Sequence, residues 1–380
     1  MKICAIICEY NPFHNGHLYQ LREAKRLSGA DAVLCIMSGN FVQRGEAAIM
    51  DKFTRAKHAL TAGADAVIEL PVVFSTSNAE LFAKGAISVL SSIPAVKTLC
   101  FGCENANETA FKLAARYLND EPQDVSDKIK ELIASGVSFA KARANAWAGY
   151  IPLEILCSPN NILGLEYTRA ILTKNANIDI LPIERVGSGY HQTELQDDFP
   201  SATAIRRTLQ EQKTLKNGVP DFVLRDLPKT LENTLETLEK HAVLSRSKEE
   251  IARVCDCSEG LENAFKKAAE QAQPFSETLT SARYTSSRIR RIALQVLLGI
   301  EESFIRECLS APLYLRILAI KKENRELLST LSHASCPILA RAHDEDVLEG
   351  VAKTCFEKEI FADKIYRLLY PTTKKVPVFY

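Results

Sequence analysis

Short apolar runs, rich in valine, isoleucine and cysteine, recur along the chain up to about residue 215. They occupy residues 2–8, 31–37, 65–71, 96–102 and 153–159. Between them, residues 17–28, about 51–62, and 78–91 carry apolar side chains at helical spacing. Runs that are apolar on both faces and alternate with helices are typical of a parallel sheet with helices on both sides. The sequence therefore predicts an α/β fold in which each run is a buried strand.

The pattern changes after about residue 220. Segments at 231–244, 261–272, 286–300 and 313–331 have apolar positions three and four apart, and they show no clear strand pattern. A chain of 380 residues is long enough for two domains. We expect residues 1–218 to form the α/β domain, with a helical insertion at about 105–150, and residues 219–380 to form an all-helical domain. The glycine and proline of KNGVPDF, near 216–222, favour a boundary there.

Composition excludes several classes of protein. The 47 basic residues balance the 47 acidic ones, so a surface for nucleic acid or membrane must be local. No apolar stretch reaches the ~18 residues of a membrane-spanning helix. The 11 cysteines lie mostly in apolar segments, which indicates buried thiols in a reducing, cytoplasmic setting. Cys100 and Cys103 have C-x-x-C spacing but no second pair nearby, so we expect core packing and not a metal site.

The first turn of the predicted fold carries NPFHNGH, residues 11–17. The first strand is expected to end near Glu9 and the next helix to begin near His17, so His14 and His17 face a ligand at the strand ends. Gly16 would permit a close approach, and free N–H groups at the helix start would point the same way. Imidazoles beside a positive helix end suit a triphosphate. A metal pair would need further ligands, and none of the seven histidines is spaced to provide one.

A second candidate phosphate motif is FPSATAIRRTL, residues 199–209, where Ser201, Thr203 and Arg206 open a helix. The two motifs together resemble the H-x-G-H signature and the I-S-S-T-x-I-R motif of the nucleotidylyltransferase superfamily, which is related to class I tRNA synthetases. Ala202 replaces one hydroxyl of that second motif. The resemblance implies a Rossmann-like nucleotidylyltransferase domain.

A closer resemblance covers almost the whole chain. The blocks IICEYNPFHNGHLYQL, MSGNFVQRGEAAIMDKFTRAKHAL, SPNNILGLEYTRAI and RVGSGYHQ resemble the bacterial tRNA(Met) cytidine acetate ligase family. This implies an enzyme that activates acetate with ATP as acetyl-adenylate. It would then acetylate N4 of the wobble cytidine, C34, of elongator tRNA(Met). Mg²⁺ is expected to accompany the phosphates, and no protein partner is evident.

The resemblance also implies site residues. His14, His17 and Arg206 are expected to be catalytic, with Arg206 clamping the departing pyrophosphate through its guanidinium fork. The remaining expected ATP-binding residues are Ile7, Cys8, Glu9, Tyr10, Asn11, Pro12, Phe13, Asn15, Gly16, Leu18, Tyr19, Gln20, Gly102, Asn160, Asn161, Arg185, Ser201 and Thr203.

Two further groups of residues are candidates for substrate contacts. The block from residue 37 to 60 contains candidates for an acetate pocket or a tRNA path. For Lys52 and Arg55, a solvent-exposed helix face explains the charged side chains equally well. The candidates in this block are Ser38, Gln43, Arg44, Lys52 and Arg55. The segment SARYTSSRIRR could hold phosphates and stack a splayed base. Its expected tRNA-binding residues are Arg283, Tyr284, Arg288, Arg290 and Arg291.

Other functions remain open on these motifs. A nucleotidylyltransferase acting on a phosphorylated small molecule would use the same two motifs, and so would a pantothenate-synthetase-like ligase that joins an acyl-adenylate to a small amine. Both would leave the helical domain without an obvious task. A nucleotide sensor is a non-enzymatic alternative, against which the intact His14, His17 and Arg206 speak.

Overall fold

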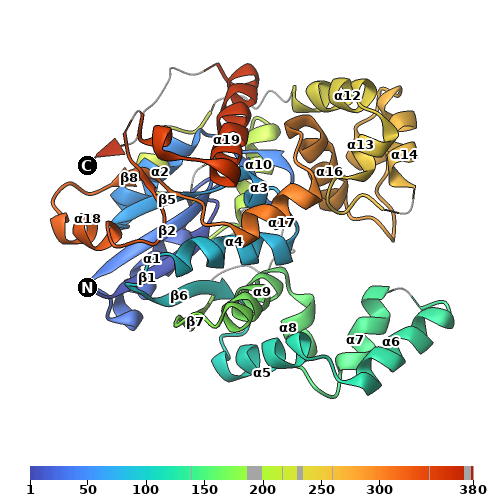
Figure 1. Cartoon of the computed structure of the whole chain (residues 1–380), viewed down its shortest axis with the longest axis horizontal. Coiled ribbons are helices and arrows are strands. Elements are labelled where there is room, and N and C mark those ends of the chain that lie inside the picture. The colour runs from blue at the N-terminus through green and yellow to red at the C-terminus, as the bar shows by residue number, and fades with distance from the viewer. Residues whose placement is uncertain are drawn as a thin grey trace.

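One sheet runs through the molecule, in the strand order β10, β8, β5, β2, β1, β6, β7, with β9 paired to β8 alone (Figure 1). The computed structural model describes residues 1–137, 139–185, 199–215, 217–228, 234–258, 260–341, 343–371 and 378–379. The strands of the sheet are β1 (Ile3–Cys8), β2 (Ala32–Ser38), β5 (Ala66–Leu70), β6 (Val96–Cys103), β7 (Asp179–Glu184), β8 (Leu315–Ile320), β9 (Ile338–Leu339) and β10 (Val378–Phe379). A separate hairpin consists of β3 (Phe41–Val42) and β4 (Glu46–Ala47).

Helices make up most of the rest of the described chain, and some of them cover the two faces of the sheet. Those of the first half are α1 (Asn15–Ser28), α2 (Lys52–Ala62), α3 (Val72–Ser75), α4 (Ala79–Ser91), α5 (Glu108–Asn119), α6 (Gln123–Ala134), α7 (Phe139–Trp147), α8 (Leu153–Cys157), α9 (Pro159–Lys174) and α10 (Ala202–Gln210). Those of the second half are α11 (Asp221–Leu224), α12 (Leu235–Ser245), α13 (Lys248–Ala252), α14 (Leu261–Ala269), α15 (Phe275–Thr278), α16 (Ser286–Leu298), α17 (Glu302–Ser310), α18 (Arg325–Leu331), the 3₁₀ turn η1 (Asp344–Val347) and α19 (Gly350–Leu369).

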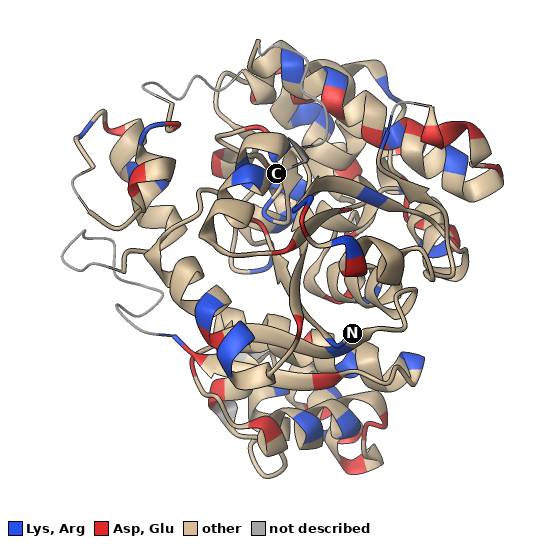
Figure 2. Ribbon diagram, turned by 90° about the vertical axis from the view of Figure 1, so that its left-hand side faces the viewer, with Lys and Arg blue, Asp and Glu red and all other residues tan. Residues whose placement is uncertain are grey.

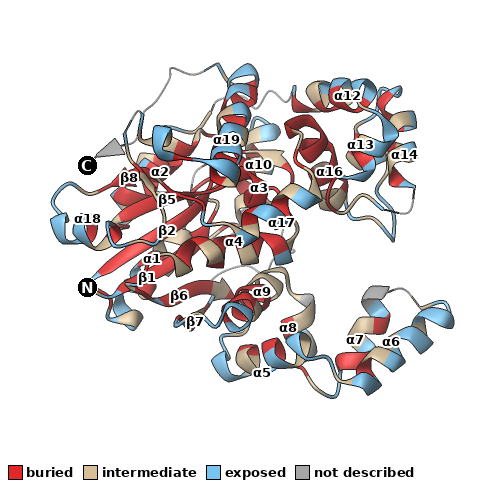
Figure 3. Cartoon of the chain, viewed as in Figure 1, coloured by how far each residue is buried: buried red, intermediate tan, exposed pale blue. Residues whose placement is uncertain are grey.

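Alternate residues of each central strand enter different cores. In β1, Ile3 and Ala5 pack with α4 and α9, whereas Cys4 and Ile6 pack with α1 and α2. Successive side chains of a strand point to opposite faces, so a strand covered on both sides must be apolar throughout. Figure 3 shows the resulting layer of buried strands between helices. The predicted parallel α/β fold is confirmed, with β1, β2, β5, β6 and β7 all parallel.

One strand expected from the sequence is wrong, and another had no prediction. Residues 153–157 form α8 and Pro159 begins α9, while the strand beyond β6 is β7, which the sequence pattern did not indicate. A short apolar run fits a buried helix turn as well as a strand. Prolines at 152 and 159 flank the run, and Pro159 opens α9. Pro at the first position of a helix costs no hydrogen bond.

The expectation of an all-helical region after residue 219 was also wrong in one respect. The region is mainly helical, but β8 pairs antiparallel with β5 and extends the sheet. Its sequence LRILAI is buried on nearly every residue, and periodicity alone does not distinguish such a short apolar run from a buried helix segment. We therefore propose that α12 to α16, which lie together away from the sheet in Figure 1, are the separate helical unit.

Helices α5, α6 and α7 lie in the segment expected to be a helical insertion. In Figure 3, α6 is largely exposed, and Val125 is its one buried residue. Cys100 and Cys103 are buried free thiols on β6. No helix in the described parts of the chain is both long and apolar enough to span a membrane.

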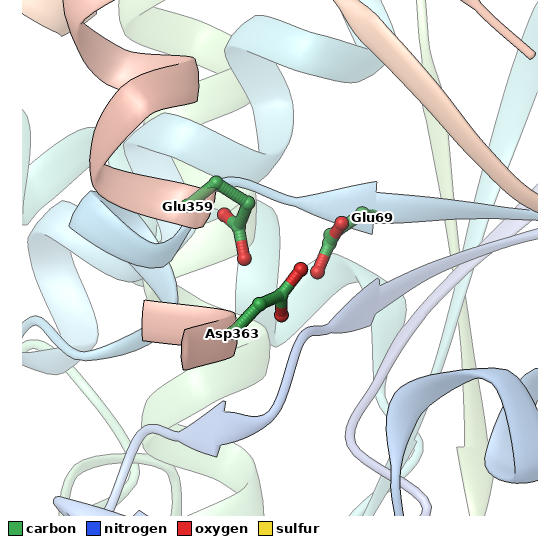
Figure 4. Close-up of side chains that lie close together, drawn as sticks. All are labelled: Glu69, Glu359 and Asp363. Carbon is green, nitrogen blue, oxygen red and sulfur yellow. The ribbon is translucent and has the colours of Figure 1, made fainter. Parts of the chain in front are cut away.

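A buried charge cluster joins the second half of the chain to the sheet. The ammonium nitrogen of Lys52 lies 2.6 Å from Glu69, 2.8 Å from Asp363 and 3.7 Å from Glu359. Arg316 lies 3.0 Å from Glu69 and 3.4 Å from Asp363. Figure 4 shows the three carboxyl groups converging from β5 and α19. Because Lys52 already sits among these carboxylates, the cluster is an ion-pair network and not a metal site.

The cluster shifts the protonation of its carboxyl groups in opposite directions. Burial and repulsion from Glu69 raise the pKa of Glu359 well above its usual range. Burial also acts to raise the pKa of Asp363, but Lys52 and Arg316 overcome it and lower that pKa. The two cations therefore favour an ionised Asp363 beside a protonated Glu359.

Lys52 and Arg55 of α2 are fully buried, so neither the substrate contacts nor the solvated face considered for them is correct. The Arg55 guanidinium donates hydrogen bonds to the carbonyl oxygens of Glu9, Ser38 and Gly39. These carbonyls lie at the ends of β1 and β2. Arg55 therefore fixes the backbone where the two strands end.

Replacing Lys52 with methionine should lower the free energy of unfolding by about 3–5 kcal/mol, because it leaves buried carboxylates without their central cation. Urea denaturation followed by circular dichroism measures the loss. Lys84→Met is the matched control, since Lys84 pairs with Glu80 on an exposed helix face. That change should cost under about 0.5 kcal/mol. Equal losses in the two variants would contradict a central role for Lys52.

Candidate active site

A cavity of about 590 Å³ opens at the carboxyl ends of β1 and β6. From β1 the chain proceeds to β2 and β5 on one side, while β6 and β7 lie on the other, so the order of strands reverses at this point. Ligands of open α/β sheets bind in the crevice at such a reversal. The turn before α1, the start of α10 and parts of α4, α9 and α16 complete the lining.

His14 and His17 lie side by side in this cavity. His14 is the N-cap of α1, and its Nδ1 accepts a hydrogen bond from the backbone N–H of Gly16 at 3.1 Å. Nδ1 of His17 accepts from the backbone N–H of His14 at 3.2 Å, and the two rings stack with centroids 3.6 Å apart. A neutral imidazole whose Nδ1 accepts carries its proton on Nε2. Both residues line the cavity and so supply it with Nε2–H donors.

Both imidazoles are held in the neutral form. Burial, with the nearby guanidinium groups of Arg185 and Arg206, lowers the pKa of His14 from 6.5 to about 3. Burial, His14 and Arg185 lower the pKa of His17 well below its usual value. A charge on either ring would be unsolvated and close to other cations. The pair therefore offers hydrogen-bond donors without a positive charge.

The start of α1 differs from expectation in two ways. Its N–H groups already have partners: that of Asn15 donates to the carbonyl of Gly218 at 3.0 Å, and that of His17 to the carbonyl of His14 at 2.9 Å. Free N–H groups pointing at a ligand are therefore absent from residues 15–17, and that expectation was wrong. Gly16 makes room for a side chain instead of a ligand, because a Cβ there would lie 3.0 Å from Cε1 of His14.

Eight residues of the segment 7–20 line the cavity. They are Ile7, Cys8, Glu9, Tyr10, Asn11, His14, His17 and Gln20. The other expected ATP contacts of this segment are not among the lining residues. They are Pro12, Phe13, Asn15, Gly16, Leu18 and Tyr19. Phe13, for example, is buried against Tyr10, with ring centroids 4.8 Å apart.

The second motif reaches the same cavity from α10. Ser201 is the N-cap of this helix, and its hydroxyl oxygen accepts a backbone N–H bond. Arg206 follows one turn later, where Nη1 donates to the carbonyl of Asn11 at 2.8 Å and Nη2 lies 3.5 Å from Glu46. Ser201, Thr203 and Arg206 all line the cavity. Two motifs that are far apart in the sequence thus meet at one site.

The expected ATP-binding residues on β6, on α9 and after β7 divide into two groups. Gly102, Asn160 and Arg185 line the cavity, but Asn161 does not. Asn161 is fully buried, and its Oδ1 accepts from the N–H of Glu104 at 2.9 Å. Asn161 therefore holds the loop after β6 against α9. The rest of the block RVGSGYHQ, after Arg185, lies outside the described residues.

Of the remaining acetate candidates, Gln43 and Arg44 line the cavity, on the turn of the β3–β4 hairpin. Ser38 is fully buried, its hydroxyl has no hydrogen-bond partner among the described residues, and it does not reach the cavity. The acetate site, if it lies in this block, is therefore restricted to the hairpin turn.

Several lining residues had no prediction, among them Glu46, Phe82 and Tyr167. Phe82 and Tyr167 face each other from α4 and α9, with ring centroids 6.5 Å apart. Aromatic residues in apolar helices are usually core residues, so their pattern carried no functional signal. Tyr167 does belong to the block SPNNILGLEYTRAI, which was the one available indication.

The five residues expected to bind tRNA lie just before α16 and in its first two turns, beside the cavity. Arg288 donates to the carbonyl of Asp256 at 2.7 Å, and Arg291 lies 3.0 Å from the carboxylate of the same residue. The guanidinium groups of Arg283 and Arg288 lie 5.8 and 5.0 Å from the ring centre of Tyr284. In Figure 2 basic and acidic positions are interspersed over the ribbon, in keeping with the zero net charge.

The hairpin turn packs against α16. Arg290 lies 3.3 Å from Glu46, and its Nε donates to the carbonyl of Arg44 at 3.2 Å. Gly45 has a φ of +71°, and a Cβ there would come within 2.5 Å of the backbone of Arg290. This close contact requires glycine. Arg291, Ser287 and the N-cap Thr285 of α16 line the cavity directly.

Comparison with known proteins agrees with this geometry. A family model described as HIGH Nucleotidyl Transferase matches residues 1–377. A tRNA(Met) cytidine acetate ligase of Thermoanaerobacter sp. (strain X514) is 39% identical, over 97% of this chain and 96% of the relative. That of Acetivibrio thermocellus is 36% identical, over 97% and 95%.

Solved structures show the same relationship. The apo crystal structure of Thermotoga maritima TmcAL superposes with a TM-score of 0.91 at 30% identity, covering 100% of this chain and 99% of that one. The structure of the same protein bound to alpha-thio ATP gives 0.89 at 32% identity, with the same coverage. The chain therefore belongs to the HIGH nucleotidyl transferase family and, within it, to the tRNA(Met) cytidine acetate ligases.

Proposed function

We propose that this chain is an ATP-dependent tRNA(Met) cytidine acetate ligase that forms acetyl-adenylate and transfers the acetyl group to N4 of C34 of elongator tRNA(Met). The observation that carries the proposal is the meeting of His14, His17 and Arg206 in one cavity at the strand reversal. Membership of the family supports the substrates. Because elongator tRNA functions in the cytoplasm, the proposed enzyme would act there.

In the first step an acetate oxygen attacks the α-phosphorus of ATP and pyrophosphate leaves. Acetate is already ionised at pH 7, so this step needs no general base. Its demands are alignment of the two anions and stabilisation of the charge that develops on the phosphate oxygens. We propose that the Nε2–H groups of His14 and His17 bind the α-phosphate. Arg206, Ser201 and Thr203 would bind the departing pyrophosphate.

Mg²⁺ would enter this site with the triphosphate of ATP. The one group of three potential metal-ligand side chains within the described residues is the buried Glu69, Glu359 and Asp363, which Lys52 already neutralises. The cavity lining offers no comparable set among the described residues. Hard cations commonly keep several waters and bind through substrate phosphates, which fits this lining.

In the second step the acetyl group passes to the cytidine amine and AMP leaves. The start of α16 lines the cavity beside the phosphate residues, so an RNA bound against this helix would reach the adenylate. We propose that Arg283, Tyr284, Arg288, Arg290 and Arg291 contribute to this contact. Arg44 and Gln43 on the adjoining turn are the candidates for holding acetate.

The direct test is mass spectrometry of tRNA(Met) after incubation with the purified protein, ATP, Mg²⁺ and acetate. We expect N4-acetylcytidine in the digest, dependent on both acetate and ATP. A small-molecule acceptor would instead give pyrophosphate release without acetylated tRNA. If the protein binds ATP but releases no pyrophosphate, it is a nucleotide sensor and not an adenylate-forming enzyme.

Either His14→Ala or His17→Ala should lower acetate-dependent ATP–pyrophosphate exchange by at least about 100-fold, because each removes a donor to the developing charge. His333→Ala, at an exposed position outside the cavity, is the control and should stay within about twofold of wild type. Circular dichroism checks that all three variants fold. Exchange near the wild-type rate in either cavity variant would exclude the phosphate role of that histidine.

The neutral form of His14 predicts a specific dependence of stability on pH. Its pKa is about 3 in the folded protein against 6.5 ordinarily, so between these values the unfolded state binds more protons. Stability must therefore fall as pH is lowered through this range, by about 2 kcal/mol at pH 5 for this group alone.

The measurement compares urea unfolding at pH 7 and pH 5. His14→Asn retains a good N-cap but cannot titrate. The wild-type protein should lose about 2 kcal/mol more than His14→Asn on acidification. If both proteins lose the same stability, His14 is not held neutral by the fold.

A further inference from the structure

Glu9, at the end of β1, is a carboxylate in a cavity that we assign to anionic substrates. Its Oε1 accepts a hydrogen bond from the backbone N–H of Gln43 at 2.7 Å. Its Oε2 has no hydrogen-bond partner, and the carboxylate has no ion pair within 4.0 Å, among the described residues. The side chain is partly exposed and lines the cavity. A negative charge here opposes the binding of both ATP and acetate, and the adenylation step makes no use of it.

The acyl-transfer step, in contrast, requires a proton acceptor. The N4 lone pair of cytosine is delocalised into the ring, so the amine is a weak nucleophile. As N4 bonds to the acetyl carbon, the carbon–oxygen bond to AMP breaks and AMP leaves with that electron pair. One N4 proton must then be removed to give the neutral amide. Proton transfer to a positioned side chain typically accelerates such a step by about 10²–10⁴-fold.

The other titratable groups of the lining are poorly suited to accept this proton. His14 and His17 use Nδ1 to accept backbone N–H bonds and carry protons on Nε2. Glu46 lies 3.5 Å from Arg206 and 3.3 Å from Arg290. The pKa values of the Cys8, Tyr10 and Tyr167 side chains are raised by burial, so these groups stay protonated.

We propose that Glu9 is the general base of acyl transfer: its carboxylate accepts a hydrogen bond from N4 of the target cytosine and takes the N4 proton as AMP departs. The inference rests on the proposed function. Carboxylates commonly accept from the N4 amino group of cytosine. The same contact would repel the carbonyl oxygen that uracil carries at this position, so Glu9 would also favour cytosine.

The surroundings fix Glu9 without neutralising it. The backbone carbonyl of Glu9 accepts from Arg55, and Gln43 holds one carboxylate oxygen. The charged and titratable groups that act on it are Arg55 from α2, Arg206 from α10, Arg44 from the hairpin and Tyr167 from α9. Burial raises the pKa of Glu9 above 4.5 despite the three arginines. A raised pKa makes the carboxylate a stronger base.

The experiment separates the two half-reactions. ATP–pyrophosphate exchange with acetate reports adenylation, and rapid-quench transfer of labelled acetate from preformed enzyme-bound acetyl-adenylate to tRNA(Met) reports acyl transfer. Glu9→Gln keeps the size of the side chain and an oxygen for the Gln43 N–H. We expect it to slow transfer by at least about 100-fold and exchange by less than about tenfold.

Glu108→Gln is the control, because it removes a carboxylate charge at an exposed position outside the cavity. Its transfer step should slow by less than about tenfold. Wild-type transfer should fall as pH is lowered through the raised pKa of Glu9. Glu9→Asp should keep this inflection at a lower rate, and Glu9→Gln should lose it.

Three results would overturn the inference. Transfer at the wild-type rate in Glu9→Gln would exclude the base while leaving the proposed function intact. Equal losses in both half-reactions would show that Glu9 only shapes the cavity. A wild-type protein that exchanges pyrophosphate with acetate but acetylates no tRNA(Met) would exclude the RNA acceptor together with the role of Glu9.

Discussion

The ion pairs of Lys52 hold the active-site edge of the sheet in place. Buried charges are tolerated only when paired, so α2, β5, β8 and α19 must meet at one point for any of them to be stable there. Asn40 extends the network, because its Nδ2 donates to Asp363 and its Oδ1 accepts from the N–H of Lys52. One turn along α2, Arg55 binds the carbonyls at the ends of β1 and β2. Helix α2 thus links the C-terminal helix to the floor of the cavity.

The cavity combines neutral donors with a few charged groups. His14 and His17 are uncharged because burial and nearby guanidinium groups disfavour imidazolium. Arg206 has a partial counterion in Glu46, so its charge is compensated before any phosphate binds. Such preorganised dipoles and ion pairs act in a partly desolvated site, where electrostatic effects are strongest and little reorganisation is needed. A carboxylate without an ion pair among the described residues is costly in this setting, which is why the position of Glu9 requires a chemical explanation.

The sequence predicted the parts of the fold that depend on local pattern and short motifs. Strands at 2–8 and 31–37 were recognisable from runs that are apolar on both faces, and His14 and Arg206 from their motifs. The errors concern residues whose environment is set by distant segments. Lys52 is exposed or buried depending on Glu359 and Asp363, near the other end of the chain, which no local pattern reveals. Strand β8 was missed for the same reason, since its partner β5 belongs to a much earlier part of the sequence.

The position of α16 connects the nucleotide cavity with the helical region. Gly45 brings the hairpin turn against the backbone of this helix, and Glu46 lies between Arg206 of the second motif and Arg290 of α16. If one of these two arginines moves from Glu46 to a phosphate, the carboxylate of Glu46 pairs with the other arginine alone. Triphosphate binding at Arg206 would therefore strengthen the ion pair between Glu46 and Arg290, and phosphate binding at Arg290 would strengthen the one between Glu46 and Arg206. In the proposed reaction the two substrate sites would thus be linked through Glu46.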